Sequence, residues 1–288
     1  MSIRKGNRFF KILLISFFSL ISLVAIVFFT FIFPRRTTPI LMYHSLSESE
    51  EKDEVISLKL NVFARQMEYL SKHNYKIVSL EKLVEKMKEG EKIPDNWVVI
   101  TFDDGERNFY ELAYPIIRKY RFPVTLFVIL DTLEDNERYL TWQMLDKLKE
   151  DDLVGIGSHS ISHQPLTLLL PKQAGEELLD SKLILEERLK RKAAFFSYPF
   201  GATNNLLKEM TKEAGYEAAA GSAYQRGEFD DKDIFCLKRV FVSKLSSRPL
   251  VFKFMLSGYY LPTRELILKV LNIKTPRQAQ PTLENYFD

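Results

Sequence analysis

The chain has 288 residues, of which 46% are hydrophobic and 27% charged, so it can bury one sizeable core once any membrane segment is set aside. Its 41 Lys and Arg residues against 38 Asp and Glu give a formal net charge of +3, which does not indicate nucleic acid as a partner. The single cysteine, Cys236, excludes an internal disulfide, so stability has to come from packing and from any bound metal.

The amino-terminal segment is long and apolar enough to cross a membrane. No charged residue occurs from Ile12 to Phe33, and a helix rising about 1.5 Å per residue spans a hydrocarbon core of roughly 30 Å over this length. Bulky phenylalanines continue up to Pro34 without a small-residue cleavage site, which favours an uncleaved signal anchor over a cleaved signal peptide. Both alternatives put the domain from Thr38 onward outside the cytoplasm. Flanking basic residues predict a cytoplasmic amino terminus, because four precede the segment and two follow it: Arg4, Lys5, Arg8, Lys11, Arg35 and Arg36.

Beyond this segment, short apolar runs alternate with amphipathic stretches, which predicts a parallel sheet covered by helices. The predicted strands are, in chain order, Pro39 to Tyr43, Trp97 to Phe102, Val124 to Leu130, Phe195 to Tyr198 and Leu237 to Val242. The predicted helices begin at the caps Asn61, Ser79 and Thr141, or cover Lys172 to Lys192, Asn204 to Ala214, Leu250 to Tyr260 and Glu265 to Leu271. This alternation of strands and helices fits a (β/α) barrel better than a doubly wound sheet. No GxGxxG motif follows a predicted strand, so the sequence does not indicate a dinucleotide site.

Three short segments follow predicted strands, where the loops of such barrels hold active sites. In the first, Asp103 and Asp104 stand between a buried apolar strand and Gly105. Two adjacent carboxylates at such a place are costly unless a cation or hydrogen bonds compensate them. Taken alone, the segment could equally be a solvated turn.

The second segment carries two of the four histidines in the chain, His159 and His163, between a glycine and a proline. Together with one carboxylate they would make a two-histidine, one-aspartate site, which suits zinc and leaves positions open for water and substrate. A pair of surface histidines is the alternative. The third segment, Phe195 to Gly201, is by itself no more than a strand that ends in an aromatic turn.

In this order and placement, the three segments resemble motifs of the polysaccharide deacetylase family, carbohydrate esterase family 4, which shares the NodB homology domain. The likeness extends from Pro39 to about Val242 and includes Ile40 to His44 and Leu140 to Trp142. It implies a distorted (β/α) barrel, a divalent metal that is usually zinc, and hydrolysis of N-acetyl groups on amino sugars.

The resemblance also implies a role for each matching residue. Asp104, His159 and His163 would be the metal ligands, and Asp103 would be the general base. In the third segment, Tyr198, Pro199 and Phe200 would lie on the substrate side, with the backbone N–H of Phe200 directed at the oxyanion of the tetrahedral intermediate.

The sequence departs from the family pattern in two places. Many members carry an arginine two residues before the proline of the third motif, where it orients the base, and this chain has Ser197 there. Arg239 resembles a late arginine of one branch and could replace it; the alternative is a plain surface arginine. No histidine follows His163 to act as general acid. His44 resembles the histidine given that role in the poly-N-acetylglucosamine branch, and its alternative role is structural.

We therefore expect three parts: a cytoplasmic tip and signal anchor over residues 1–37, a deacetylase domain over 38–247, and a helical extension with a tail over 248–288. The expected reaction is removal of N-acetyl groups from an amino-sugar polymer. Poly-N-acetylglucosamine and peptidoglycan both remain open as the polymer. The alternatives are an O-acetyl esterase of the same fold and a surface glycan-binding protein without turnover.

Overall fold

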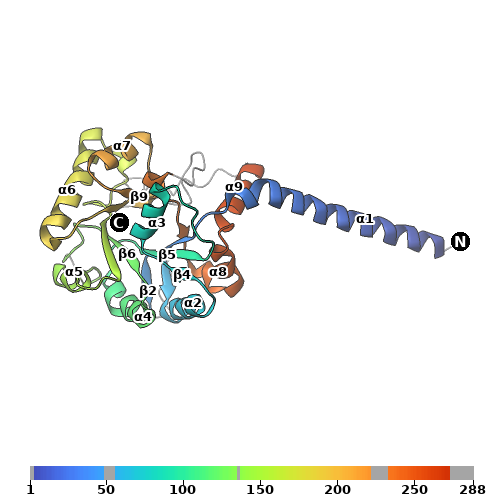
Figure 1. Ribbon diagram of the computed structural model, residues 1–288, viewed down its shortest axis with the longest axis horizontal. Coiled ribbons are helices and arrows are strands. Elements are labelled where there is room, and N and C mark those ends of the chain that lie inside the picture. The colour runs from blue at the N-terminus through green and yellow to red at the C-terminus, as the bar shows by residue number, and fades with distance from the viewer. Residues whose placement is uncertain (1–2, 49–55, 135–136, 222–232, 273–288) are drawn as a thin grey trace, which may run out of the picture.

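The computed structural model describes residues 3–48, 56–134, 137–221 and 233–272. A long helix, α1 (Ile3–Val27), stands out from a rounded domain of strands and helices (Figure 1). The helical path continues through Phe28–Ile32 and Phe33–Arg35, and by length and composition the stretch Phe10–Arg35 could cross a membrane. The predicted tail beyond residue 272 lies outside the described residues.

The domain is built on a curled sheet whose strands all pair in parallel. The strand order is β10-β1-β5-β6-β7-β8-β9, and β4 pairs with β5 beside this path. At the open side, Ala220 makes a parallel bridge to Leu237, just before β10, so the curl is almost closed. These strands are β1 (Ile40–Tyr43), β4 (Lys76–Ile77), β5 (Trp97–Phe102), β6 (Val124–Val128), β7 (Val154–Ser158), β8 (Phe195–Ser197), β9 (Ala218–Ala220) and β10 (Val240–Phe241), with β2 (Ser45–Ser47) and β3 (Ser57–Lys59) forming a separate pair. The predicted distorted (β/α) barrel is confirmed.

Alternation along β5 explains how a buried strand leads into a polar site. Successive side chains of a strand point to opposite faces, so Trp97 and Val99 pack inside the curl while Val98 and Ile100 pack against the outer helices. Helix α3 (Leu80–Lys88) packs against the same inner cluster at the amino ends of the strands, and in Figure 1 it lies across the middle of the ring. The inner positions at the carboxyl ends are therefore left for polar side chains.

The outer helices follow the predicted pattern, except that the helix Tyr114–Tyr120 was not predicted and one cap needs correction. The hydroxyls of Ser79 and Thr141 accept hydrogen bonds from the first turns that follow them, as predicted. The amide oxygen of Asn204, where a helix was predicted to begin, also caps its helix. The helix assigned to an Asn61 cap instead begins at Leu60, because Lys59 already adopts the extended backbone that precedes the helix. The outer helices are α2 (Leu60–Lys72), α4 (Tyr114–Tyr120), α5 (Trp142–Leu148), α6 (Pro171–Leu189) and α7 (Asn205–Glu213).

The carboxyl-terminal helices differ from the prediction in where they divide. They are α8 (Pro249–Leu256) and α9 (Tyr260–Val270), and the break falls at Gly258. Gly258 has a φ of +79°, and a Cβ there would lie 2.5 Å from the carbonyl oxygen of Thr37. The chain after α1 passes so close to Gly258 that only glycine fits there, and this contact determines where α8 ends. Helical periodicity in the sequence does not reveal such a contact. Tyr259 also stacks on Phe33, so α9 begins where the apolar helix meets the domain.

Candidate active site

The predicted site residues follow the carboxyl ends of neighbouring strands. His44 follows β1, Asp103 and Asp104 follow β5, and His159 follows β7. Backbone hydrogen bonds extend the sheet into these loops: the N–H of Asp103 donates to Tyr43 O (3.0 Å), and the N–H of His159 donates to Val128 O (2.8 Å). Because all strands run in parallel, these loops meet at the same edge of the sheet.

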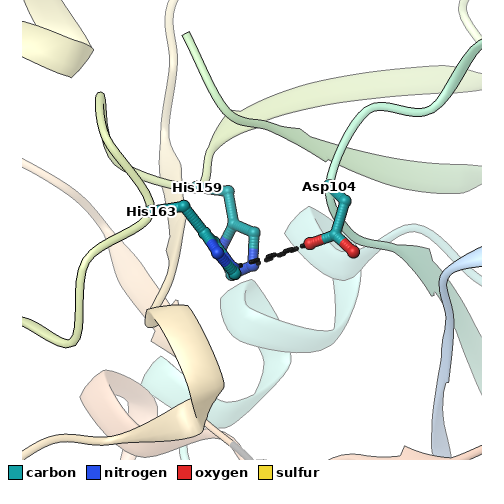
Figure 2. A group of neighbouring side chains, drawn as sticks. All are labelled: Asp104, His159 and His163. Carbon is teal, nitrogen blue, oxygen red and sulfur yellow. Dashed lines mark ion pairs between the residues drawn. The ribbon is translucent and has the colours of Figure 1, made fainter. Parts of the chain in front are cut away.

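Asp104, His159 and His163 form a compact cluster (Figure 2). One ligand atom from each lies within 4.8 Å of the others. Oδ1 of Asp104 is 3.4 Å from Nε2 of His159 and 3.7 Å from Nε2 of His163. Around a tetrahedral cation with bonds of about 2.1 Å, neighbouring donor atoms would lie about 3.4 Å apart. The cluster therefore has the spacing and donor types of a metal site.

Hydrogen bonding and burial prepare both imidazoles for a ligand role. Nδ1 of His159 lies 2.7 Å from the carbonyl oxygen of Ser197, which requires a proton on Nδ1 and makes Nε2 the atom available to a metal. Burial by itself would lower the pKa of His159, but the carboxylates of Asp103 and Asp104 outweigh it and raise the pKa. Burial, helped by the neighbouring His159, lowers the pKa of His163 to about 4, so its ring is neutral at pH 7. Neutral imidazole is the form that binds a metal.

The loops around the cluster depart from ordinary backbone conformations. Asp104 has a φ of +71° and Gly105 of +72°, while Ser160, His163 and Phe200 have φ values of +70°, +58° and +58°. Non-glycine residues rarely adopt such angles, and they do so where surrounding contacts enforce them, often at functional sites. Here the turns direct three side chains from two loops toward one point.

Asp103 lies beside this cluster, and a buried arginine holds it. Nη1 and Nη2 of Arg239 donate to the two carboxylate oxygens, each at 2.6 Å, and both side chains are almost fully buried. Burial by itself would raise the pKa of Asp103, but the charges of Arg239 and His159 outweigh it and lower the pKa. Asp103 is thus an ionised carboxylate at neutral pH, and its Oδ2 lies 3.9 Å from Nε2 of His159.

Every N–H of the Arg239 guanidinium has an acceptor. Besides Asp103, it donates to the carbonyl oxygen of Gly221 (3.0 Å), to Thr101 Oγ1 (3.2 Å) and to Ser197 Oγ (2.8 Å). Ser197 Oγ in turn donates to Asp103 Oδ2 (3.2 Å). The small side chain of Ser197 leaves room for the guanidinium of Arg239, which comes from a distant part of the sequence. Arg239 is buried, which excludes the alternative of a plain surface arginine.

The sequence pattern assigned no role to Thr101, which lies inside the predicted strand Trp97 to Phe102. Its hydroxyl donates to Leu41 O (2.9 Å) and accepts from Arg239. Thr101 lies two residues before Asp103, so both side chains point to the same face of the sheet. This spacing could have identified Thr101 from the sequence.

His44 follows β1 and lies close to both carboxylates. Its ring meets Phe241 edge to face, with ring centres 5.4 Å apart. Within the described part of the chain, Nδ1 of His44 is a buried polar atom without a hydrogen-bond partner. Native structures leave few such atoms, so an unsatisfied one beside two carboxylates marks a candidate functional group.

The third predicted segment contributes less through its side chains than expected. The ring of Phe200 lies against His163, with centres 4.7 Å apart, so this turn borders the cluster. Tyr198 instead points away: its side chain is fully buried, and its hydroxyl pairs with Thr211 of α7 (3.1 Å). Side chains alternate along the end of β8, which sends Tyr198 outward when Ser197 faces in. Pro199 is buried and begins the short helical turn that carries Phe200.

Comparisons with known proteins point to one family. A family model described as polysaccharide deacetylase matches residues 90–219. A Bacillus subtilis protein, YxkH, whose name assigns it to the polysaccharide deacetylases, is 29% identical over 206 residues, which cover 71% of each chain. The poly-beta-1,6-N-acetyl-D-glucosamine N-deacetylase of Staphylococcus aureus is 28% identical over 186 residues, which cover 60% of this chain and 63% of that enzyme.

A solved structure shares the fold. The Streptococcus pyogenes deacetylase PplD, in complex with acetate, aligns with a TM-score of 0.69 and 23% identity over 76% of this chain and 98% of that one. The family model and the relatives agree that the chain is similar to the polysaccharide deacetylases, and the curled parallel sheet is the fold that this solved deacetylase shares.

Proposed function

We propose that this protein is a membrane-anchored, metal-dependent enzyme that hydrolyses N-acetyl groups on an N-acetylglucosamine-containing polysaccharide outside the cytoplasm. The observation that carries the proposal is that two adjacent carboxylates have different partners. Asp104 faces two imidazoles at ligand spacing, whereas Asp103 is held beside them by an arginine and is free to accept a proton. The name of the Staphylococcus aureus relative supports the amide bond and the sugar.

Asp104, His159 and His163 would hold the cation, and their donor types suit zinc with positions left open. When bound, the cation would act as a Lewis acid toward the acetyl carbonyl and would lower the pKa of nearby water to about 7. Its charge would also compensate the buried carboxylate of Asp104.

The remaining residues supply positioning and proton transfer. Asp103 accepts the proton of the attacking water, and Arg239 keeps both carboxylate oxygens aligned for it. The backbone N–H of Phe200 donates to the oxyanion that develops on the acetyl oxygen. His44 gives a proton to the departing amine, so that the products are acetate and a free amine on the polymer.

The first experiment uses membranes that contain the full chain and have been washed at alkaline pH. Incubated with poly-beta-1,6-N-acetyl-D-glucosamine, they should release acetate and create new amines in equal amounts. A chelator should remove at least nine tenths of this activity, and zinc should restore it, because the Lewis acid is lost and regained. Full turnover after complete metal removal would contradict the metal-dependent mechanism, and activity recovered only in the wash would contradict the anchor.

The same preparation separates the rival functions. An O-acetyl esterase would release acetate from acetylated xylan without creating amines from the amino-sugar polymer. A glycan-binding protein would retain the polymer and release no acetate from either. Peptidoglycan, as a third substrate, distinguishes a wall enzyme from one acting on a secreted polymer.

We further propose that residues 1–37 are a cytoplasmic tip and signal anchor, that residues 38–247 are the catalytic domain, and that residues 248–288 extend it. The apolar composition of Phe10–Arg35 supports the anchor. The packing of Tyr259 on Phe28 and Phe33 supports an extension that braces the base of the anchor helix.

For His44 we expect a substitution effect that depends on the leaving group. His44→Ala should slow amide hydrolysis by about 10²-fold or more, since proton transfer contributes on that order. It should slow hydrolysis of an activated acetate ester, whose leaving group needs no proton, far less. His73→Ala is the matched control, because His73 stacks on Tyr69 of α2. Equal slowing of both substrates would assign His44 a structural role instead.

A further inference from the structure

The loop that joins His159 to His163 is attached to helix α6 by one carboxylate. Glu177 accepts hydrogen bonds at Oε2 from the backbone N–H groups of Ile161 (2.8 Å) and Ser162 (3.0 Å), and at Oε1 from the hydroxyl of Ser162. The bonded residues lie midway between the two histidines. A single side chain therefore holds the centre of the loop that carries both imidazoles of the cluster.

The backbone on either side of these bonds is in a conformation that needs support. Ser160 and His163 both have positive φ, at +70° and +58°. Side chains with a Cβ avoid this region, so the loop would relax toward other conformations if its hydrogen bonds were lost. A hydroxyl inside the loop helps, since Ser160 Oγ accepts from the N–H of His163 (2.9 Å).

Helix α6 makes a second attachment one turn further along. Ser158 Oγ donates to Ser181 Oγ (2.8 Å) and accepts from the N–H of Ser160 (3.1 Å). Residues four apart share one face of a helix, so Glu177 and Ser181 together present a rigid polar edge to the loop. The attachment by Ser181 lies at the His159 end, which leaves Glu177 as the attachment nearest to His163.

We propose that Glu177 is a positioning residue that fixes His163 relative to His159 and so sets the affinity of the cluster for its metal. Glu177 does not reach the ligand atoms and acts through the backbone of Ile161 and Ser162. The inference rests on the proposed metal site, but it adds a residue outside the three motifs that define that site in the sequence.

Two substitutions separate hydrogen bonding from charge. Glu177→Gln keeps a carbonyl oxygen that can accept from both N–H groups, and its amide can donate to Ser162 Oγ, while the negative charge is removed. Glu177→Asp keeps the charge but withdraws the carboxylate by one methylene, out of reach of the loop. Glu177→Ala removes both. If the hydrogen bonds position His163, the glutamine variant resembles the original protein and the other two do not.

The experiment measures zinc dissociation constants by competition with a chelator, using the detergent-solubilised full chain stripped of metal. Glu177→Ala should weaken zinc binding about 10- to 100-fold, the usual effect of losing a partner that orients metal ligands. Glu177→Asp should weaken it in the same direction, and Glu177→Gln should stay within about threefold of the original value. Glu176→Ala is the matched control, since Glu176 is an exposed neighbour on the same helix that pairs only loosely with Lys172 (3.8 Å).

The outcomes that contradict the inference are distinct from those that contradict the proposed function. Absence of zinc binding by the original chain would overturn both. Zinc binding by the original chain that Glu177→Ala and Glu177→Asp leave unchanged would overturn the positioning role alone. A glutamine variant as weak as the alanine variant would show that charge, not hydrogen bonding, is responsible. Thermal unfolding of each metal-free variant identifies any that fails to fold, and the aspartate variant then carries the test.

Discussion

Replacement of Asp103 by asparagine should leave zinc affinity close to that of the original chain and should lower deacetylation by about 10²- to 10⁴-fold. Asparagine has nearly the same shape but cannot take the proton of the attacking water. Metal binding should persist because the donors of the cluster are Asp104 and the two histidines, and Asp103 is turned toward Arg239. Turnover and zinc affinity are measured on the same preparation.

Asp152→Asn is the matched control for this substitution. Asp152 is exposed and lies before the amino end of β7, whereas His159 follows the carboxyl end of that strand. Asp152→Asn should leave turnover and zinc affinity unchanged. Unchanged turnover in Asp103→Asn would remove Asp103 as the base. Loss of zinc together with turnover would assign the residue to the metal cluster instead.

Arg239→Met should reduce both stability and activity. Removing one partner of a buried ion pair leaves the other charge without compensation, which typically costs about 3–5 kcal/mol of unfolding free energy. Turnover should fall by at least about 10²-fold, because the proposed base, Asp103, loses both hydrogen bonds from Arg239 and keeps only the one from Ser197. Urea denaturation and steady-state kinetics measure the two effects. Lys238→Met removes a neighbouring positive charge and should change neither by a comparable amount.

A double substitution shows whether the stability loss arises from the buried charge of Asp103. In Arg239→Met combined with Asp103→Asn, no uncompensated carboxylate remains, so the double variant should be more stable than Arg239→Met alone. Additive losses in the two single variants would contradict this coupling. Arg239→Lys should recover part of the stability but little of the activity, since an ammonium group cannot bind both carboxylate oxygens in the fork geometry of arginine.

Local sequence pattern was sufficient for the strand that precedes the two aspartates but not for β7 (Val154–Ser158), which precedes His159 and was not predicted. A continuous apolar run predicts β5 because a strand buried on both faces needs apolar residues at every position, and Asp103 and Asp104 follow from its end. The caps at Ser79 and Thr141 were recognisable because they depend on one side chain and the next three residues. The division between α8 and α9 was placed wrongly, because it depends on contact between Gly258 and Thr37, which lie far apart in the chain.

By itself, then, the sequence determined the alternation of strands and helices, the apolar amino-terminal segment and the chemical types of Asp103, Asp104, His159 and His163, since short-range spacing and residue chemistry specify all of these. It did not predict the short strands β4, β7 and β9. The family resemblance already implied different roles for the two carboxylates, but only the tertiary structure decided which groups hold this site in place. Arg239, 136 positions from Asp103, meets it across the curled sheet, and Glu177 reaches the histidine loop from a separate helix. Periodicity carries no information about such meetings, because strand pairing and side-chain packing between distant segments create them.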